Sequence, residues 1–506
     1  MNLRHLLALV AVLASVGPVY PATLCVWTNS PHPGAPYNAW TNAARDIQTA
    51  VNAAAPGDTV LVTNGLYASG SYTVPPYTMS NRVVITTSIV VRSVNGPAVT
   101  TIRGRAAGET ADRRCVYITG GGQLSGFTLT NGAARGGAEW LDSVGGGVLV
   151  HGSGLVSNCV VCSNSAVHGG GIAAYYGGEI RNCFVYGNSG GMGSWFYGGG
   201  FYGSQGGAVY DSVFSNNSCA LGGGIGTEGN CRFVRCLVRN NQATSGGGVN
   251  MRGGDVMENC VIVSNAATTS GGGIAFQSVG GRVRNCTVVG NRGGAGIYCV
   301  GEGILVNSII VQNGSGSDNL PGTGLGYQAD HLCTTPLPSN GTGHVTADPL
   351  LLSGWRLASN SPCVDAGCTN GPADDCAGVS RPLDGNNDGT SAWDIGAYEY
   401  IHPSADSDSD GMQDSAEVRA GTDATNAESF LFVQVDTSAG SSVTGVVVRW
   451  ASAAGRTYRL DRSTNLVAGA GFVNVISNVA ALPPLNVYTD KTASGLGPWL
   501  YRIGVK

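Results

Sequence analysis

The chain has 506 residues, enough for two or three domains, and carries a net charge of −5 with only 12% charged residues. Glycine accounts for 80 residues, roughly twice its usual share, and 42% of the chain is hydrophobic. This composition excludes a disordered chain. The only lysines are Lys491 and Lys506, and no basic block could follow a phosphate backbone, so we expect no nucleic-acid partner.

Residues 1–22 are expected to be an export signal. Arg4 precedes an apolar run over residues 6–16 that ends at Gly17 and Pro18, and we expect cleavage near Ala22. The run is too short to span a bilayer, and no later segment approaches 18 apolar residues. We therefore expect an exported protein with no transmembrane helix after signal removal.

Residues 46–67, DIQTAVNAAAPGDTVLVTNGLY, predict a short helix followed by a strand. Ile47, Val51 and Ala54 form one apolar helix face, and Pro56 with Gly57 ends the helix. The segment resembles the N-terminal start of secreted β-helix proteins of the pectate-lyase-like class. That resemblance implies a helix that caps the open end of a stack of coils.

A repeat of about 24 residues organises the middle of the chain. Glycine-rich triplets mark one position of each unit, and an asparagine marks another. A small residue stands five positions before each asparagine, and an apolar residue three positions before it. The triplets begin at Gly145, Gly169, Gly198, Gly222, Gly246 and Gly271. The asparagines are Asn164, Asn188, Asn217, Asn241, Asn265, Asn291 and Asn313.

The apolar runs within each unit hold only three or four residues, which is too short for helices but suits strands. One coil cannot bury its apolar face alone, so the coils must stack. We expect the asparagines to form a hydrogen-bonded ladder and the small residues to lie inside. The small residues are Cys159, Cys183, Ser212, Cys236, Cys260, Cys286 and Ser308.

Units that combine GGGI, GGGV or GGGF with an apolar residue three positions before asparagine resemble the repeats of polymorphic outer-membrane proteins. The predicted fold is all-β. It is a right-handed parallel β-helix over residues 23–320 with an N-terminal capping helix.

Cys159, Cys162 and His168 lie close together in sequence but do not predict a metal site. Cys159 belongs to the small-residue column, and the two cysteines, three apart on a strand, should point to opposite faces. Other units place Tyr197, Leu221, Ser245 or Ser270 at the position of His168.

One unit is 29 residues long and gains its extra residues in SGGMGSWFYGGGFYG, from Ser189. Its aromatic residues are candidate ligand-binding residues, because aromatic faces on a loop can stack on sugars. The alternative is that they fold back onto the wall of the coils. The candidates are Trp195, Phe196, Tyr197 and Tyr202.

Catalysis is the alternative to binding, because this fold hosts polysaccharide lyases and glycoside hydrolases, although fold alone does not establish activity. Both chemistries need converging charged groups. The acids between residues 101 and 320 are scattered, but residues a coil apart can converge, as Arg232, Asp255 and Glu258 could. We assign no catalytic residue.

Residues 321–400 contain DPLLLSGWRLASNSPCVDAG and DIGAYEY, which resemble the choice-of-anchor Q domain that terminates many bacterial surface β-helices. The resemblance implies a secreted or cell-surface location in a bacterium.

Fifteen cysteines leave at least one thiol unpaired within the chain. A disulfide among Cys363, Cys368 and Cys376 is plausible, with the pairing open.

The linker over residues 401–429 carries DSDSDGMQDSAE, which fits the calcium-loop pattern at every fixed position. Carboxylates would bind calcium, the Met412 carbonyl would add an oxygen, and Asp414 would act through water. No helix precedes the loop, which argues against a complete EF-hand. The continuation resembles thrombospondin type 3 calcium linkers. The predicted ligands are Asp406, Asp408, Asp410, Met412, Asp414 and Glu417.

Residues 430–506 alternate apolar and polar positions between turn signals, which predicts a small β-sandwich. Taken together, the sequence favours an exported, calcium-stabilised β-helix that acts as a binding or structural module. A polysaccharide or cell-surface glycan is the expected partner. A polysaccharide lyase or glycoside hydrolase remains the alternative.

Overall fold

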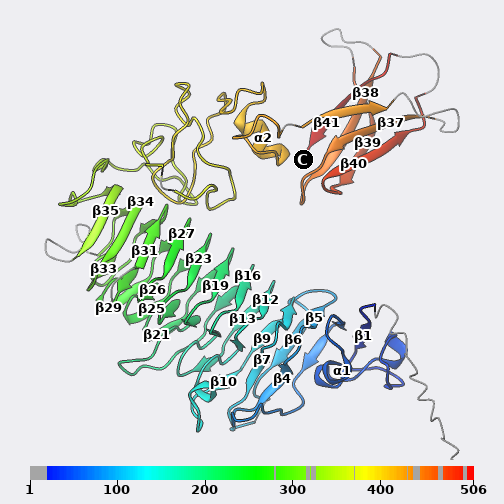
Figure 1. Cartoon of the computed structure of the whole chain (residues 1–506), viewed down its shortest axis with the longest axis vertical. Helices are drawn as coiled ribbons and strands as arrows, with labels where there is room; N and C mark the ends of the chain where they lie inside the picture. The colour runs from blue at the N-terminus through cyan, green and yellow to red at the C-terminus, as the bar shows by residue number, and fades with distance from the viewer. Residues whose placement is uncertain are drawn as a thin grey trace, which may run out of the picture.

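The computed structural model describes residues 20–506 apart from 107, 278–280, 315–318, 321–325, 370, 430, 437–444, 465–470 and 494–497. The predicted signal peptide therefore lies almost wholly outside the described residues. The main body is a parallel β-solenoid, followed by a segment without regular strands, a short helix and a small antiparallel β domain (Figure 1). The described helices are all too short or too polar to cross a membrane.

Within the described residues, each coil of the solenoid contributes strands to two large parallel sheets. The nine-stranded sheet consists of β4 (Asn81–Ile85), β7 (Arg114–Ile118), β11 (Val148–His151), β15 (Ile172–Tyr175), β18 (Phe201–Ser204), β22 (Ile225–Thr227), β26 (Val249–Met251), β30 (Ile274–Phe276) and β33 (Ile297–Cys299).

The 21-stranded sheet has two columns that adjoin within each coil. The first column is β1 (Thr23–Val26), β2 (Thr59–Val62), β5 (Val90–Ser93), β8 (Gln123–Ser125), β12 (Leu155–Ser157), β16 (Glu179–Arg181), β19 (Ala208–Tyr210), β23 (Arg232–Val234), β27 (Val256–Glu258), β31 (Gly281–Arg284), β34 (Gly303–Val311) and β35 (Tyr327–Thr334). The second column is β3 (Gly65–Tyr67), β6 (Thr100–Arg103), β9 (Thr128–Thr130), β13 (Val160–Cys162), β17 (Phe184–Tyr186), β20 (Val213–Ser215), β24 (Leu237–Arg239), β28 (Val261–Val263) and β32 (Thr287–Val289), and it ends on β34.

Short strands line the remaining side of the coils. They are β10 (Ala133–Ala134) with β14 (Ser165–Ala166), and β21 (Ser218–Leu221), β25 (Gln242–Ser245) and β29 (Ala266–Ser270). Single turns of 3-10 helix occur at Trp40–Asn42 and Trp140–Ser143.

The core is a continuous apolar stack along the inside of the coils. Because side chains alternate along a strand, the middle residue of each three-residue strand points inward, as Ile180, Val209 and Phe233 do, and all three are fully buried. The predicted small-residue column also lies inside, since Cys159 and its equivalents are at most 2% exposed. This confirms the inward placement predicted for the column.

Left-handed residues produce the bends between strands. Asn182, Asp211 and Arg235 connect the two columns with φ between 51 and 52°. The first glycine of each triplet also has positive φ, and a Cβ at Gly198 would collide with the Phe201 carbonyl oxygen. Glycine is therefore required there by both conformation and space.

The predicted asparagine ladder is present and buried. From Asn188 to Asn313, each side-chain oxygen accepts from the backbone N–H and the Nδ2 of the preceding asparagine, at 2.9–3.0 Å. Each Nδ2 also donates to a main-chain carbonyl, for example Asn241 to Phe214 at 3.0 Å. Asn319 extends the ladder beyond Asn313.

Helix α1 (Ile47–Ala53) closes the N-terminal end of the stack against β1, β2 and β4, as predicted. Asp46 caps it, with its carboxylate accepting from Thr49 N at 2.8 Å. Ile47 and Val51 are buried against the first coils, and Ala54 packs partly against the same core.

The outer face of the nine-stranded sheet is covered near its middle. Leu149 and Tyr202 point away from the coil interior, yet loops fold over them and bury them. His168 lies in this covering layer, 2% exposed, between the rings of Trp140 and Tyr197. Burial lowers the pKa of His168 to about 4.

The C-terminal domain consists of two antiparallel three-stranded sheets in the described residues. Val448, Trp450, Tyr458 and Leu460 are buried together as its core. The strands are β36 (Val433–Asp436), β37 (Val446–Ala451), β40 (Leu485–Asp490), β39 (Val473–Ala480), β38 (Thr457–Ser463) and β41 (Leu500–Val505). This matches the predicted small β-sandwich.

We predict that Asn241→Ala strongly destabilises the solenoid. The substitution leaves buried groups of Asn217 and Phe214 without partners, and each such group costs ~1–3 kcal/mol. The free energy of unfolding, measured by urea titration, should fall by at least ~3 kcal/mol. Gln242→Ala, which truncates the exposed neighbouring amide, is the control; equal loss in both variants would contradict a specific role for the ladder.

We predict that acid destabilises the fold through His168. An unfolded histidine has a pKa near ~6.5, so between about pH 4 and 6.5 the unfolded chain binds the extra proton. The free energy of unfolding should therefore fall as the pH drops through this window, by up to ~3 kcal/mol. His168→Gln should flatten that part of the pH profile, whereas His32→Gln, at an exposed position, should not.

Candidate functional site

The acidic segment after the solenoid folds into a tight loop. Carboxylate oxygens of Asp406, Asp408 and Asp410 lie within 4.8 Å of one another. Each carboxylate also accepts from a backbone N–H of the loop: Asp406 from Gly411 at 2.9 Å, Asp408 from Asp410 at 3.2 Å, and Asp410 from Met412 at 2.7 Å. The loop is thus held in a turn that directs its remaining oxygens toward one point.

Four carboxylate oxygens in this loop are buried without a hydrogen-bond partner: Asp406 Oδ1, Asp408 Oδ2, Asp410 Oδ2 and Glu417 Oε2. Glu417 comes from helix α2 (Asp414–Ala420), which follows the loop, and is fully buried. Burial, with the nearby Asp408 and Asp410, raises the pKa of Glu417 to about 7. Unpaired buried carboxylates are costly, and a bound cation is the usual compensation.

Asp414, predicted to contact calcium through water, also accepts hydrogen bonds that order the loop. It is fully buried, and its two oxygens accept from the Ser407 backbone N–H at 2.8 Å and from Ser407 Oγ at 2.7 Å. These bonds order the loop, and the predicted contact of Asp414 with calcium through water stays a prediction. Met412 contributes its N–H to the turn, and its carbonyl as a ligand stays a prediction.

The acidic loop lies where three parts of the chain meet. Ser407 Oγ accepts from Asp384 N at 2.8 Å, which ties the loop to the segment before it. On the other side, Arg456 of the C-terminal domain donates to the Val418 carbonyl of α2 at 2.8 Å. The conformation of the acidic loop is therefore linked to the segment before it and to the C-terminal domain after it.

The aromatic loop is divided between exposed and buried residues. Trp195 is 69% exposed, as expected for a ligand-binding side chain, whereas Phe196 is half-buried against His168. Tyr197 and Tyr202 are buried, so for these two the alternative holds, namely that they fold back onto the wall of the coils. Their hydroxyls bond to Arg252 at 2.9 Å and to Glu228 at 2.6 Å, which fixes both rings on the coil wall.

Arg232, Asp255 and Glu258 do not form one site. Arg232 pairs with Glu258 at 2.8 Å on the outer face of the first column. Asp255 is fully buried and accepts from Cys231 N at 2.8 Å and from Arg252 N at 3.0 Å. Burial raises the pKa of Asp255 to about 6. Among the described acids between residues 101 and 320, no three lie close enough together to bind one metal ion.

A cleft of about 260 Å³ lies where residues 335–413, the covering segment between β35 and α2, pack over the second column. Val213, Leu237 and Val261 stack in register from successive coils and form its floor. Trp355 and Tyr398 line it from the covering segment. In Figure 1 this segment, in yellow, lies beside the last coils of the solenoid.

Exposed aromatic rings continue the cleft onto the uncovered coils. Phe184 is in register with Val213 of the floor, is 38% exposed and stacks on Tyr186 with ring centroids 4.7 Å apart. Arg235, at the edge, pairs with Asp211 and Asp374, each at 2.6 Å. The repeat predicts which residues of the second column point outward. It does not predict that residues 355 and 398 lie beside them, because those residues belong to a segment without repeats.

The fifteen cysteines, all within the described part of the chain, are unpaired, so the disulfide expected among Cys363, Cys368 and Cys376 is not formed. Cys363 is buried against the second column, and Cys376 lines the cleft. Cys368 lies elsewhere, facing β35.

No family model and no curated protein sequence matches the chain. Among solved structures, the crystal structure of pectate lyase Pel9A is similar, with a TM-score of 0.43 and 16% sequence identity. The alignment covers 75% of this chain and 97% of that one. The likeness concerns the parallel β-solenoid fold and carries no information on activity.

Proposed function

We propose that the protein is an exported or cell-surface binding module that holds a glycan against the second column of its solenoid. The observation that supports this most is the aromatic surface that runs from Phe184 and Tyr186 into the cleft beside Trp355. Aromatic faces next to groups that form hydrogen bonds suit a sugar ring, which has both apolar and hydroxyl faces.

The cleft is large enough for only one part of an extended ligand. Its volume of about 260 Å³ is just below the ~300–1,000 Å³ typical of enclosed small-molecule pockets. A glycan chain would place one part in the cleft and another on the open aromatic pair. The regular spacing of coils gives such a chain a repeated, rigid surface.

We further propose that calcium binds the acidic loop through Asp406, Asp408, Asp410 and Glu417. Four buried oxygens without partners and the spacing of the acids support this. Calcium favours six to eight oxygen ligands, so carbonyl and water oxygens would complete the shell. The ion would stiffen the junction between the cleft-forming segment and the C-terminal domain.

We predict that Phe184→Ala and Tyr186→Ala each weaken glycan binding at least ~10-fold, because each removes a stacking face. The measurement is retention on a panel of neutral and uronate polysaccharides, followed by titration with the best binder. Trp195→Ala, which truncates the exposed ring of the aromatic loop, is the matched control.

Three results would overturn this assignment. One is no retention on any glycan by the unmodified protein. Another is loss of binding in Trp195→Ala alone, which would move the site to the aromatic loop. The third is release of unsaturated products or reducing ends during incubation, which would make the protein a lyase or hydrolase.

We predict that removing calcium with a chelator lowers the thermal stability of the junction. A ligand present at about 100 times its Kd stabilises the folded state by ~2.7 kcal/mol. Asp410→Asn should abolish the calcium-dependent shift in melting temperature, whereas Glu428→Gln, at an exposed acid outside the loop, should keep it. A melting temperature that changes with neither chelator nor added calcium would contradict the proposed calcium site.

A further inference from the structure

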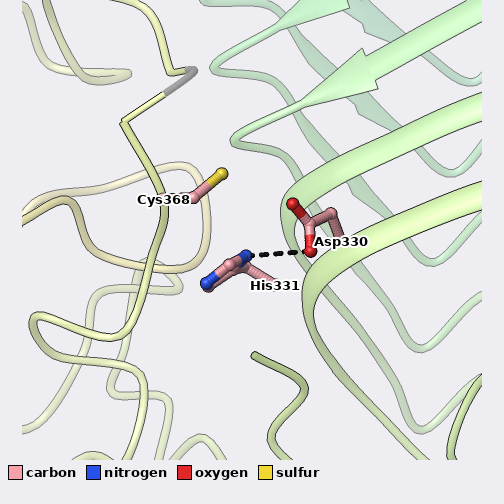
Figure 2. Close-up of side chains that lie close together, drawn as sticks. All are labelled: Asp330, His331 and Cys368. Carbon is pink, nitrogen blue, oxygen red and sulfur yellow. Dashed lines mark ion pairs between the residues drawn. The ribbon is translucent and has the colours of Figure 1, made fainter. Parts of the chain in front are cut away.

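Asp330, His331 and Cys368 converge near the C-terminal end of the solenoid and belong to neither site described above (Figure 2). Asp330 and His331 lie on β35, the last strand of the first column, and Cys368 comes from the covering segment. One possible ligand atom from each lies within 4.8 Å of the other two. The residues are half-buried, so an ion could reach them from solvent.

The imidazole of His331 leaves one nitrogen facing the cluster. Nδ1 is buried, makes no hydrogen bond and lies 3.2 Å from Asp330 Oδ1. The opposite edge, with Cδ2 and Nε2, packs on Gly343, where any Cβ would collide with the ring. His331 also has a positive φ of 48°, a strained conformation that is retained when the surroundings enforce it.

Hydrogen bonds outside the cluster fix the other two residues. Asn307 clamps the backbone of Cys368: its Oδ1 accepts from Cys368 N and its Nδ2 donates to Cys368 O, each at 2.9 Å. Asp330 Oδ1 accepts from Thr342 N at 3.1 Å and from Thr342 Oγ1 at 3.0 Å. Such outer partners orient ligands around metals.

We propose that Asp330, His331 and Cys368 bind a zinc ion. Thiolate, imidazole nitrogen and carboxylate are the three ligand types that Zn²⁺ takes, and a three-residue set leaves its fourth position open to water. Zinc–ligand bonds of about 2.0–2.3 Å in a tetrahedron place ligand atoms about 3.3–3.8 Å apart. The approach of 3.2 Å between Nδ1 and Oδ1 is already close to that range.

The geometry fits a metal better than an acid–base relay to the thiol. In a relay, the histidine uses one ring nitrogen toward the carboxylate and the other toward the nucleophile. Here Nε2 packs on Gly343, and Figure 2 shows the Cys368 sulfur and the Asp330 carboxylate on the Nδ1 side of the ring. Ligands that face one point from three directions are typical of a bound cation.

Cobalt is the probe that tests this site, because a cysteine thiolate bound to Co²⁺ gives a near-ultraviolet charge-transfer band that oxygen ligands do not. The metal-free full chain, kept reduced with a phosphine, is titrated with Co²⁺. We expect a thiolate band that saturates at one equivalent, is bleached by Zn²⁺ and is unaffected by Ca²⁺.

Cys368→Ser should remove the thiolate band, and Cys376→Ser, at a half-buried thiol outside the cluster, should keep it. Thr342→Val leaves all three ligands in place but removes a bond to Asp330, and should weaken Zn²⁺ binding ~10–100-fold. The absence of a thiolate band in the unmodified chain would overturn the proposal. So would a band that persists in Cys368→Ser.

Discussion

The buried asparagine column is the interaction on which the rest of the structure depends. A coil of 24 residues has too little apolar surface to be stable alone, and its bends leave main-chain groups that must find partners away from water. The side chain of each asparagine bonds main-chain groups of the coil before it. Its Nδ2 also donates to the side-chain oxygen of the next asparagine. A coil that stacks in register therefore buries its apolar side chains and pairs its polar main-chain groups at the same time. A coil that stacks out of register would bury polar groups without partners.

This regularity decides where functional groups can lie. Inward positions are reserved for packing, so acids such as Asp255 that turn inward serve the fold. Outward positions are free to vary, and loops can be inserted at bends without disturbing the stack. The cleft, the acidic loop and the Asp330–His331–Cys368 cluster all involve the segments that follow the regular coils, where the chain returns over its own surface or leaves it.

Features that repeat along the sequence could be predicted in detail, because each copy confirms the others. The strand positions, the inward cysteines and the ladder all follow from period and alternation, whereas the capping helix follows from the apolar face and the Pro-Gly stop of one segment. The acidic loop was predictable from spacing within twelve residues, although the hydrogen bonds that Ser407 donates to Asp414 were not.

Contacts between distant segments were not predictable. Nothing in the repeat places Trp355 over Val213, or Cys368 beside His331. Tyr202 shows the same limit: alternation points it outward as expected, but the loop from the 29-residue unit and its neighbours cover it. Whether an outward side chain is exposed depends on which loop folds over that face of the sheet. The loops do not repeat, so the sequence gives no signal for where they fold.

The central claim is that side-chain oxygens of the ladder hold the backbone of the neighbouring coil. Amide hydrogen exchange tests it directly, by comparing peptides that contain Asn217 in the unmodified chain and in Asn241→Ala. The Asn217 N–H donates to Asn241 Oδ1 at 2.9 Å, so the account predicts slow exchange in the first and markedly faster exchange, centred on Asn217, in the second. Equal protection of Asn217 in both proteins would contradict it.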